Sequence, residues 1–372
     1  MKNYVDIFIP TKDRAMQLHL LFDGINNHLN SIGKITVSFQ ASNDEYKNAY
    51  KLLEKRLHHD EHFKNIRNNS QSIIFKERDS IEKVYNHFQD SGDSDFILQL
   101  LDDEVIVGKY DLFAENASQE FFKNENIVSC SLRLGDNISE QNSWSKDDGV
   151  VNEIPEGHIS ALFSYGKPNY VVPSISHEIS HEISQNYGNE DFIKWLWPLN
   201  MNASHWNQIC CLTGHIYRRK FLLNLYEKFG KSFFMDIEGQ GSKMLQRDLF
   251  KNIKYLLPIL DILDFFQMKL LKWIAGIYEQ PVLLITFYKI FFHTRLRNKE
   301  IPTYMISPIK SVSVNCEMGS SFFRGHNLDQ THELNSLYLD KKVMCINDIE
   351  SIKFFFPWTI LKERKYIDYS AD

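Results

Sequence analysis

The first 110 residues alternate between short apolar runs of strand length and longer segments with helical periodicity, and this alternation constrains the fold more than any other feature. The runs contain β-branched residues, whereas the segments between them repeat apolar residues every three or four positions. This rhythm predicts an α/β fold, with a mainly parallel, Rossmann-like sheet and helices on both faces. The expected strands cover residues 5–9, 35–41, 72–75 and 96–101, and the expected helices cover residues 15–29, 45–57 and 81–88.

Polar turns follow three of the expected strands. Residues 10–11 follow the first strand, residues 42–44 the second and residues 102–104 the fourth. Parallel strands bring their carboxyl ends to one edge of a sheet, and ligands bind at that edge. The three turns are therefore expected to meet in one site.

The turn after the fourth strand consists of three consecutive acids, Asp102, Asp103 and Glu104, with apolar residues on both sides. Adjacent carboxylates repel one another and lose hydration beside a buried strand, so a fold tolerates them best when a cation faces them. A divalent metal that bridges phosphates needs one or two protein carboxylates in a fixed place. The acids therefore favour a metal–phosphate site, and the alternative is a solvated acidic turn.

Composition narrows the classes of protein further. Of the 372 residues, 43% are apolar and 13% are aromatic, which is enough for one large domain or two ordinary ones. The formal net charge of −6 gives no basic field, so no nucleic-acid partner is expected. The five cysteines show no CxxC spacing, which is typical of reduced thiols in a cytoplasmic protein. Neither a signal peptide nor a membrane-spanning helix is expected.

Four segments occur in an order and spacing that resemble a known enzyme family. They are residues 7–14 (IFIPTKDR), 38–44 (SFQASND), 99–104 (QLLDDE) and 213–219 (TGHIYRR). Together they resemble the nucleotide-sugar glycosyltransferases of the GT-A fold, of the family-2 type. The resemblance covers about residues 4–250. It implies a GT-A-like sheet, Mn²⁺ or Mg²⁺ as cofactor, and a nucleotide diphosphate sugar as donor, with a UDP-sugar favoured.

The resemblance places the donor site at the edge of the sheet, where the acids correspond to the metal-binding DxD motif. Aligned on residues 99–100, Asp103 is the principal metal ligand and Asp102 contacts the ribose or a second metal; aligned on the acids alone, Asp102 and Glu104 form the pair. Arg78 lies where a basic residue often neutralises phosphate, and a solvated helix charge is the alternative. Nucleotide-sugar contacts are implied for Pro10, Thr11, Arg14, Ser42, Asp44, Arg78 and Asp102, and metal contacts for Asp103 and Glu104.

Two later segments supply the remaining candidates. An inverting transferase needs a carboxylate that takes a proton from the acceptor hydroxyl, and the Glu-Asp pair of the family is interrupted here, which leaves Asp236 and Glu238 as alternatives. An acid at the start of a helix is the competing interpretation. Near the end of the chain, His326 is a candidate metal ligand and Arg324 a candidate phosphate clamp, with a surface-loop histidine as the alternative.

The resemblance also divides the chain into regions. Residues 1–250 are expected to form a GT-A-like catalytic domain, with a nucleotide-binding half at 1–110 and an acceptor half at 111–250. Residues 299–372 are expected to form a tail that completes the site. Residues 251–298 combine helical apolar spacing with lysines and a tryptophan, which predicts amphipathic helices as a C-terminal subdomain. Packing of these helices on themselves is favoured; a membrane-facing surface and an oligomer interface are the alternatives.

These features predict a metal-dependent glycosyltransferase of surface polysaccharide synthesis, which moves a sugar from a nucleotide diphosphate to a glycan or lipid-linked acceptor. It is expected in the cytoplasm, where a peripheral contact with the inner face of the membrane would suit a lipid-linked acceptor. The alternatives are a nucleotidyltransferase on the same sheet and an inactive nucleotide- or sugar-binding protein. A zinc-protease pattern at His177, Glu178 and His181 is disfavoured because no convincing third ligand follows it.

Overall fold

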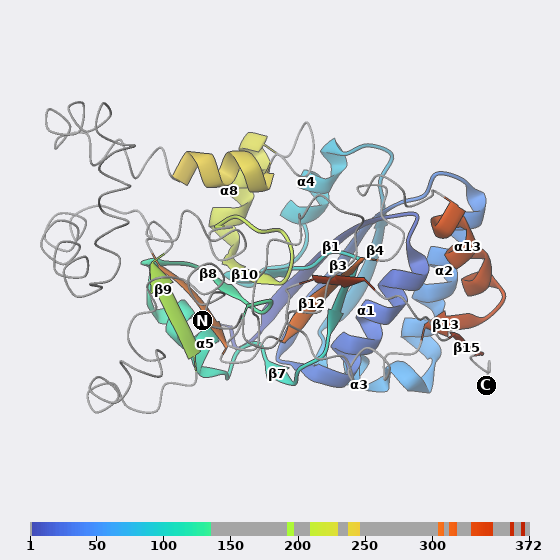
Figure 1. The fold of residues 1–372 in the computed structure, drawn as a ribbon, viewed down its shortest axis with the longest axis horizontal. Helices are drawn as coiled ribbons and strands as arrows, with labels where there is room; N and C mark the ends of the chain where they lie inside the picture. The colour runs from blue at the N-terminus through green and yellow to red at the C-terminus, as the bar shows by residue number, and fades with distance from the viewer. Residues whose placement is uncertain are drawn as a thin grey trace, which may run out of the picture.

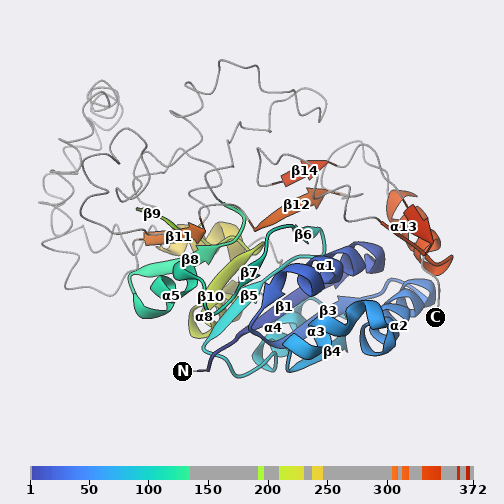
Figure 2. The same ribbon diagram turned by 90° about the horizontal axis from the view of Figure 1, so that it is seen from below.

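The computed structural model describes residues 2–134, 192–196, 209–229, 237–245, 304–308, 312–317, 329–344, 358–360 and 366–368. These residues form an eight-stranded sheet with helices on both faces (Figures 1 and 2). The strand order is β4-β3-β1-β5-β10-β8-β11-β9. The bounds are β1 Val5–Lys12, β3 Ile32–Gln40, β4 Ser72–Glu77, β5 Phe96–Gln99, β8 Ile127–Ser131, β9 Phe192–Leu196, β10 His215–Arg218 and β11 Tyr304–Pro308.

The sheet is mixed, with a parallel half that comes from the start of the chain. β4, β3, β1 and β5 pair in parallel, and β8 pairs in parallel with β11. β10 is antiparallel to both β5 and β8, and β9 is antiparallel to β11. The predicted α/β fold with a mainly parallel sheet is confirmed.

Helices that follow the early strands cover the two faces of the sheet. Helix α1 contacts both α2 and α3, and α4 contacts α8, with which it lies on the upper side in Figure 1. A further helix covers residues 237–245. The helix bounds are α1 Ala15–His28, α2 Asp44–His59, α3 Lys64–Asn69, α4 Glu82–Gln89, α5 Asn116–Lys123, α8 Arg219–Phe229 and α13 Asp329–Leu339, with a 3-10 turn η1 at Glu61–Phe63.

Three small sheets complete the described structure. Their strands are β6 (Glu104–Ile106) with β12 (Ser313–Glu317) and β14 (Trp358–Ile360); β13 (Lys342–Met344) with β15 (Tyr366–Asp368); and β2 (Leu29–Asn30) with β7 (Tyr110–Asp111). β12 pairs antiparallel with β6, so a segment from the end of the chain lies beside the strand that starts at the acidic turn.

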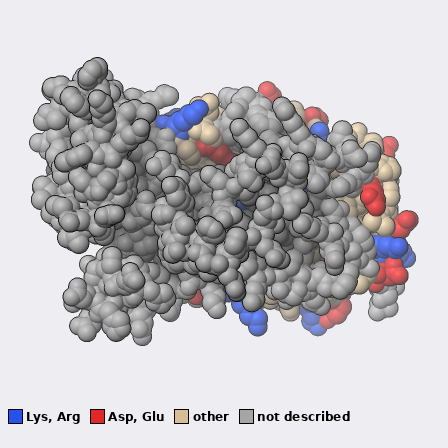
Figure 3. Space-filling model, viewed as in Figure 1, with Lys and Arg blue, Asp and Glu red and all other residues tan. Residues whose placement is uncertain are grey.

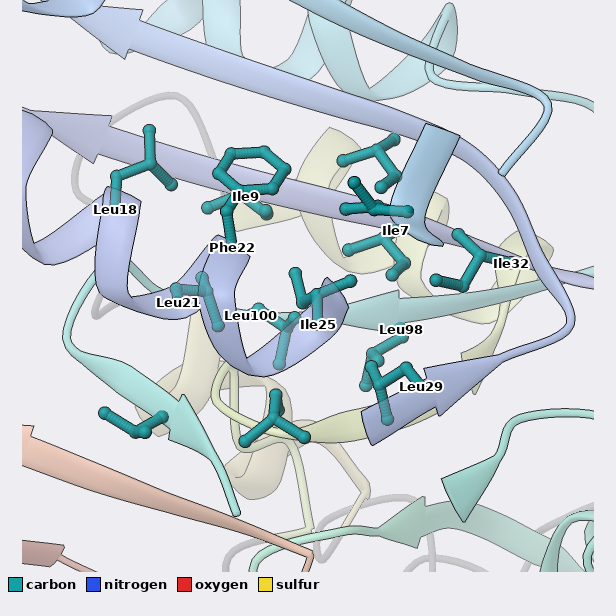
Figure 4. Packing of buried hydrophobic residues seen from close by; sticks show 14 of the residues in the cluster. Ile7, Ile9, Leu18, Leu21, Phe22, Ile25, Leu29, Ile32, Leu98 and Leu100 are labelled. Atoms are coloured by element: carbon teal, nitrogen blue, oxygen red, sulfur yellow. The ribbon is translucent and has the colours of Figure 1, made fainter. Parts of the chain in front are cut away.

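The side chains of β1 alternate between two hydrophobic cores, one on each face of the sheet. Ile7 and Ile9 belong to the core under α1, as Figure 4 shows. Phe8 belongs to the core on the opposite face, where its ring meets Phe88 and Tyr226 edge-on at centroid distances of 5.1 and 6.2 Å. Burial on both faces explains why β1 reads as a continuous apolar run in the sequence.

The backbone of α1 approaches that of β6 closely at Gly24. A Cβ at this position would lie 2.7 Å from the carbonyl oxygen of Ile106, which is too close for any other residue without a shift of the helix. The helix after β1 and the strand after the acidic turn are therefore held together by direct backbone approach. This contact fixes where the acids lie relative to β1.

Charged side chains of both signs are interspersed where described residues reach the face shown in Figure 3. Exposed ion pairs on the surface, such as Lys83 with Asp79 at 2.6 Å, contribute little to stability. Among the described residues, no helix has the length and apolar character needed to cross a membrane. The predicted helices of residues 251–298 lie outside the described residues.

Candidate functional site

The candidate site lies where the order of the strands reverses. From β1 the chain proceeds to β3 and then β4 on one side, whereas β5 lies on the other side of β1. Such a reversal opens a crevice at the carboxyl ends of the two central strands, and ligands of α/β proteins bind there. The turn after β1 contains Arg14, and the turn after β5 contains Asp102 and Asp103, so these predicted residues share this position.

Direct hydrogen bonds join the two turns. The Thr11 hydroxyl donates to Asp102 Oδ2 at 2.6 Å, and Arg14 Nη1 donates to Asp102 Oδ1 at 3.0 Å. The same Arg14 nitrogen lies 3.5 Å from Asp103 Oδ2. The structure therefore brings together four predicted site residues: Thr11, Arg14, Asp102 and Asp103.

Tyr50 of α2 supports these contacts, and the sequence analysis missed it. Its hydroxyl accepts the backbone N–H of Arg14 at 3.0 Å and lies 2.9 Å from Thr11 Oγ1. Because the Thr11 hydroxyl donates to Asp102, the Tyr50 hydroxyl is the donor in its bond to Thr11. Burial raises the pKa of Tyr50 well above its usual value, so the phenol keeps the proton that this chain of hydrogen bonds needs.

Arg78, a predicted phosphate contact, is a buried cation whose partners are neutral. Its side chain is 7% exposed; Nη1 donates to Gln40 Oε1 at 2.8 Å and Nη2 donates to the Thr11 carbonyl at 3.2 Å. Its Nε has no hydrogen-bond partner within the described residues. Burial lowers the pKa of Arg78. A buried guanidinium with a vacant donor beside the two turns is suited to an anion.

The turn after β3 is tied to the turn after β1 through Asp13. Asp13 Oδ1 accepts the backbone N–H of Ser42 at 2.7 Å, and Oδ2 accepts the Ser42 hydroxyl at 2.5 Å. Asn43 caps α2, since its side chain accepts the N–H of Tyr46 at 3.1 Å. Asp44, the first residue of α2, is exposed. The end of β1 and the turns after β3 and β5 thus meet at one edge, although the Ser42 hydroxyl is already bound by Asp13. The prediction of a turn at residues 10–11 is wrong, because β1 continues to Lys12 through its pairing with β3.

The acid pair has an asymmetric electrostatic environment. Burial and the neighbouring Asp102 charge raise the pKa of Asp103, whereas Arg14 and Arg133 oppose this effect. The pKa of Arg14 is raised, mainly by Asp102. Both oxygens of Asp102 have donors, Thr11 and Arg14. The surroundings of Asp103 therefore disfavour its ionised form, which a bound cation would stabilise.

Glu104 has a different environment from the other two acids. It is fully buried; Oε2 accepts the N–H of Leu101 at 3.2 Å and Oε1 accepts the Ser313 hydroxyl at 3.4 Å. Burial raises the pKa of Glu104 to about 8, so this carboxyl is mainly protonated at neutral pH. The predicted metal contact of Glu104 stays a prediction, and in the structure its oxygens face the backbone and β12.

Replacing Glu104 with glutamine should make the protein relatively more stable as the pH rises. The folded-state pKa of about 8 exceeds the ordinary value of 4.5, so folding favours the protonated form. The stabilisation from this group is complete below pH 4.5 and is lost as the pH rises through 8. At about 1.4 kcal/mol per pKa unit, wild type is expected to lose up to several kcal/mol relative to Glu104→Gln. Urea unfolding of both proteins at pH 5, 7 and 9 measures this, and parallel pH profiles would contradict it.

Glu238, the described candidate base, begins the helix at 237–245 instead of lying on an extended segment. Its Oε1 accepts the N–H of Leu212 at 2.7 Å, and burial raises its pKa. The competing interpretation, an acid in the first turn of a helix, describes this local structure correctly. The contact with Leu212 joins Glu238 to the loop that precedes β10.

Arg133, which the sequence analysis missed, acts electrostatically on the acids and on Glu238. Its Nη1 donates to Cys211 Sγ at 3.1 Å and contacts the Thr213 hydroxyl. Its positive charge lowers the pKa values of Asp103, Glu104 and Glu238. Arg133 is therefore close enough to the candidate metal ligand and the candidate base to affect both.

Gly214 permits the close packing around Arg133. It adopts a left-handed backbone conformation, with φ of +62°, and a Cβ there would lie 2.6 Å from Arg133 Cγ, Glu104 Oε1 and Ser313 Oγ. Only glycine fits such a conformation and such an approach without strain. The glycine turn that carried part of the family resemblance therefore has a packing role next to the acids.

The chemistry of the acid pair suits a divalent metal that also binds phosphate. Mn²⁺ and Mg²⁺ accept one or two protein carboxylates and take their other ligands from phosphates and water. Among the described residues, no three His, Cys, Asp or Glu side chains are grouped for a metal held by the protein alone. Asp236, Arg324 and His326 lie outside the described residues, as do His177, Glu178 and His181.

Comparison with known proteins adds no relative from which a role could be transferred. The sequence matches neither a protein-family model nor a curated protein. The candidate site therefore depends on its own geometry and on the resemblance of its motifs.

Proposed function

We propose that this protein is a metal-dependent glycosyltransferase with a GT-A-like fold. Its proposed donor is a nucleotide diphosphate sugar, and a UDP-sugar is favoured. The observation that carries the proposal is the contact of Thr11 and Arg14 with Asp102 where the strand order reverses. An acid pair at that position, beside a buried arginine, offers the charges that a metal and a diphosphate require.

In this proposal the protein neutralises the departing diphosphate from two sides. Asp103, together with Asp102, would hold Mn²⁺ or Mg²⁺, and the bound metal would stabilise negative charge on the diphosphate. Arg78 would supply a second positive charge through its vacant Nε. Pro10, near the end of β1, and the exposed Asp44 are the proposed contacts to the base and ribose.

Glu238 is the proposed base among the described residues, and Asp236 is its alternative. A general base must lose its proton to accept one from the acceptor hydroxyl. Burial raises the pKa of Glu238, which hinders ionisation, while the positive charge of Arg133 favours ionisation. Arg133 therefore helps to keep this carboxylate near the protonation state that catalysis needs.

The proposed acceptor is a glycan or a lipid-linked glycan of surface polysaccharide synthesis. This part rests on the motif resemblance and on the amphipathic pattern of residues 251–298, which suits an acceptor at the inner face of the membrane. An extract of lipid-linked acceptors assayed with the identified donor would test it.

A thermal-shift screen of UDP, GDP, TDP and CMP, with and without Mn²⁺, tests the donor site. One diphosphate with Mn²⁺ is expected to raise the melting temperature by several degrees, more than the nucleotide or the metal alone. Ligand at 100 times its Kd stabilises the folded state by about 2.7 kcal/mol. Absence of metal-dependent stabilisation by every nucleotide would refute the donor site.

Two further assays separate the alternatives. A nucleotidyltransferase would transfer a nucleotide from a nucleoside triphosphate to a sugar phosphate and release pyrophosphate. A glycosyltransferase would release no pyrophosphate from the same mixture. An inactive binding protein would bind the nucleotide sugar but would not hydrolyse it, even slowly. Release of free sugar from the matching donor would therefore support the enzyme over both alternatives.

A further inference from the structure

The acid pair of the candidate site already has a cation in the structure, and that cation is a side chain of the protein. One nitrogen, Arg14 Nη1, lies 3.0 Å from Asp102 Oδ1 and 3.5 Å from Asp103 Oδ2. A guanidinium within reach of both carboxylates compensates the same charges that a shared divalent metal would bind. A metal that binds both acids therefore has to displace Arg14.

We propose that Arg14 is the internal counter-ion of Asp102 and Asp103, and that it makes metal binding depend on nucleotide. This inference rests on the proposed function, because it concerns the same metal–nucleotide site. Without nucleotide, the guanidinium compensates the two acids and competes with the metal. When a metal–diphosphate complex binds, Arg14 leaves the acids and binds the phosphate oxygens.

The cost of burying the acids explains why such a counter-ion is present. The side chains of Asp102 and Asp103 are 9% and 15% exposed. Two adjacent carboxylates at this depth repel one another and have little water to stabilise them. Arg14 is the cation in direct contact with both, within the part of the chain that the structure describes.

The backbone of Arg14 is fixed while its guanidinium has few contacts. Its N–H donates to Tyr50, and its carbonyl accepts the N–H of Leu18 at the start of α1. The guanidinium contacts Asp102 and Asp103, and the side chain is 19% exposed to solvent. We expect rotation about the side-chain bonds to move the charge off the acids without movement of α1.

A diphosphate offers Arg14 a better partner than the acids do. Guanidinium and phosphate form paired, charge-assisted hydrogen bonds, whereas one Arg14 nitrogen now serves both carboxylates. The exchange gives the acids a divalent cation and gives the arginine a phosphate. By linkage, nucleotide must then tighten metal binding and metal must tighten nucleotide binding by the same factor.

The test measures the affinity for Mn²⁺ alone and for Mn²⁺ with UDP, by electron paramagnetic resonance of free Mn²⁺ and by calorimetry. Arg14→Gln should bind Mn²⁺ alone about 10-fold or more tightly than wild type, a typical size for coupling between sites. Its affinity for UDP in the presence of Mn²⁺ should fall. Arg14→Lys, which keeps the charge, should resemble wild type with the metal alone.

Lys12→Gln is the matched control for loss of one positive charge. Lys12 is exposed at the end of β1, two residues from Arg14. Its removal should leave the affinity for Mn²⁺ unchanged, and an equal gain in this variant would overturn the specific role of Arg14. The internal counter-ion is also refuted if wild type binds Mn²⁺ with UDP but Arg14→Gln shows no tighter binding of Mn²⁺ alone.

Failure of the proposed function gives a different result. If neither wild type nor Arg14→Gln binds Mn²⁺ or UDP, the proposed donor site and the proposed role of Arg14 are both wrong. If Arg14→Gln does not fold in EDTA, refolding with Mn²⁺ provides the readout. Recovery of folding by Mn²⁺ supports the counter-ion, and failure to recover refutes it.

Discussion

Asp103→Asn should abolish the stabilisation that Mn²⁺ and a nucleotide diphosphate produce together, with a loss of about 100-fold or more in the affinity for UDP at saturating Mn²⁺. Loss of even an indirect support of a metal site costs about 10-fold to 100-fold, and Asp103 is the proposed direct ligand. Asparagine keeps the size of the side chain and removes only the charge. Asp102 alone would leave the metal with one carboxylate fewer, and Asp102 Oδ2 still accepts from Thr11. Calorimetric titration with UDP measures the effect.

The same variant should fold at least as well as wild type when no metal is present. The neighbouring Asp102 charge and burial both disfavour ionised Asp103, so a neutral side chain relieves repulsion. Asp79→Asn provides the control, since Asp79 is an exposed acid paired with Lys83. Equal loss of UDP affinity in both variants, or none in Asp103→Asn, would remove Asp103 from the site.

Asp6→Asn should destabilise the fold by about 3–5 kcal/mol, the usual effect of breaking a buried ion pair. Asp6 is fully buried; its Oδ2 accepts from Arg219 Nη2 at 2.5 Å and from the N–H of Ser94 at 2.9 Å, and its Oδ1 accepts from the N–H of Lys34 at 2.7 Å. Loss of the charge leaves Arg219 partly buried without its counter-ion. Equilibrium unfolding in urea measures the change in the free energy of unfolding.

Two further variants separate the buried pair from general effects of charge. Asp93→Asn removes an exposed acid that pairs with Lys2, and it should change the free energy of unfolding far less than Asp6→Asn does. Arg219→Met added to Asp6→Asn should cost less than the sum of the single changes, because the two groups interact directly. Additive effects of the pair, or equal losses in Asp6→Asn and Asp93→Asn, would contradict this role of the pair.

The early strands and helices could be predicted because their signals are local. β1 and α1 follow the apolar pattern of their own residues, and the observed α1, Ala15–His28, ends one residue before the prediction. The position of β10 could not be predicted in this way. It enters the sheet between β5 and β8 through long-range pairing, which no local pattern encodes.

The residues of the candidate site that could be predicted are those that the ends of strands bring together. Thr11 lies near the end of β1 and Arg14 just after it, while Asp102 and Asp103 follow β5. A parallel sheet alone therefore brings these residues to one edge. Tyr50 and Arg133 reach the site from a helix and a loop, through tertiary contacts that periodicity does not show. Arg133 stands out only as a charged residue between Leu132 and Leu134, and Tyr50 only as one aromatic residue of an amphipathic helix; many core positions share these patterns.

Glu104 shows why three consecutive acids need not have one role. Asp102 and Asp103 lie in a turn, whereas β6 begins at Glu104 and pairs with β12. The carboxyl of Glu104 therefore faces β12 and the loop before β10, while Asp102 faces Arg14 and Thr11. The sequence predicts an acidic turn after the fourth strand. The direction of each side chain depends on where that turn ends and β6 begins.

The position of β10 also determines how the sheet can be assembled during synthesis. β4, β3, β1 and β5 come from the first hundred residues, but β10, the neighbour of β5, leaves the ribosome more than a hundred residues later. Until then one side of β5 is an open strand edge, and open edges invite pairing with other chains. A fragment that ends before residue 215 keeps that edge exposed beside the acidic turn. Truncated forms of the nucleotide-binding half therefore need β10, supplied in the same chain or as a separate segment, to remain monomeric.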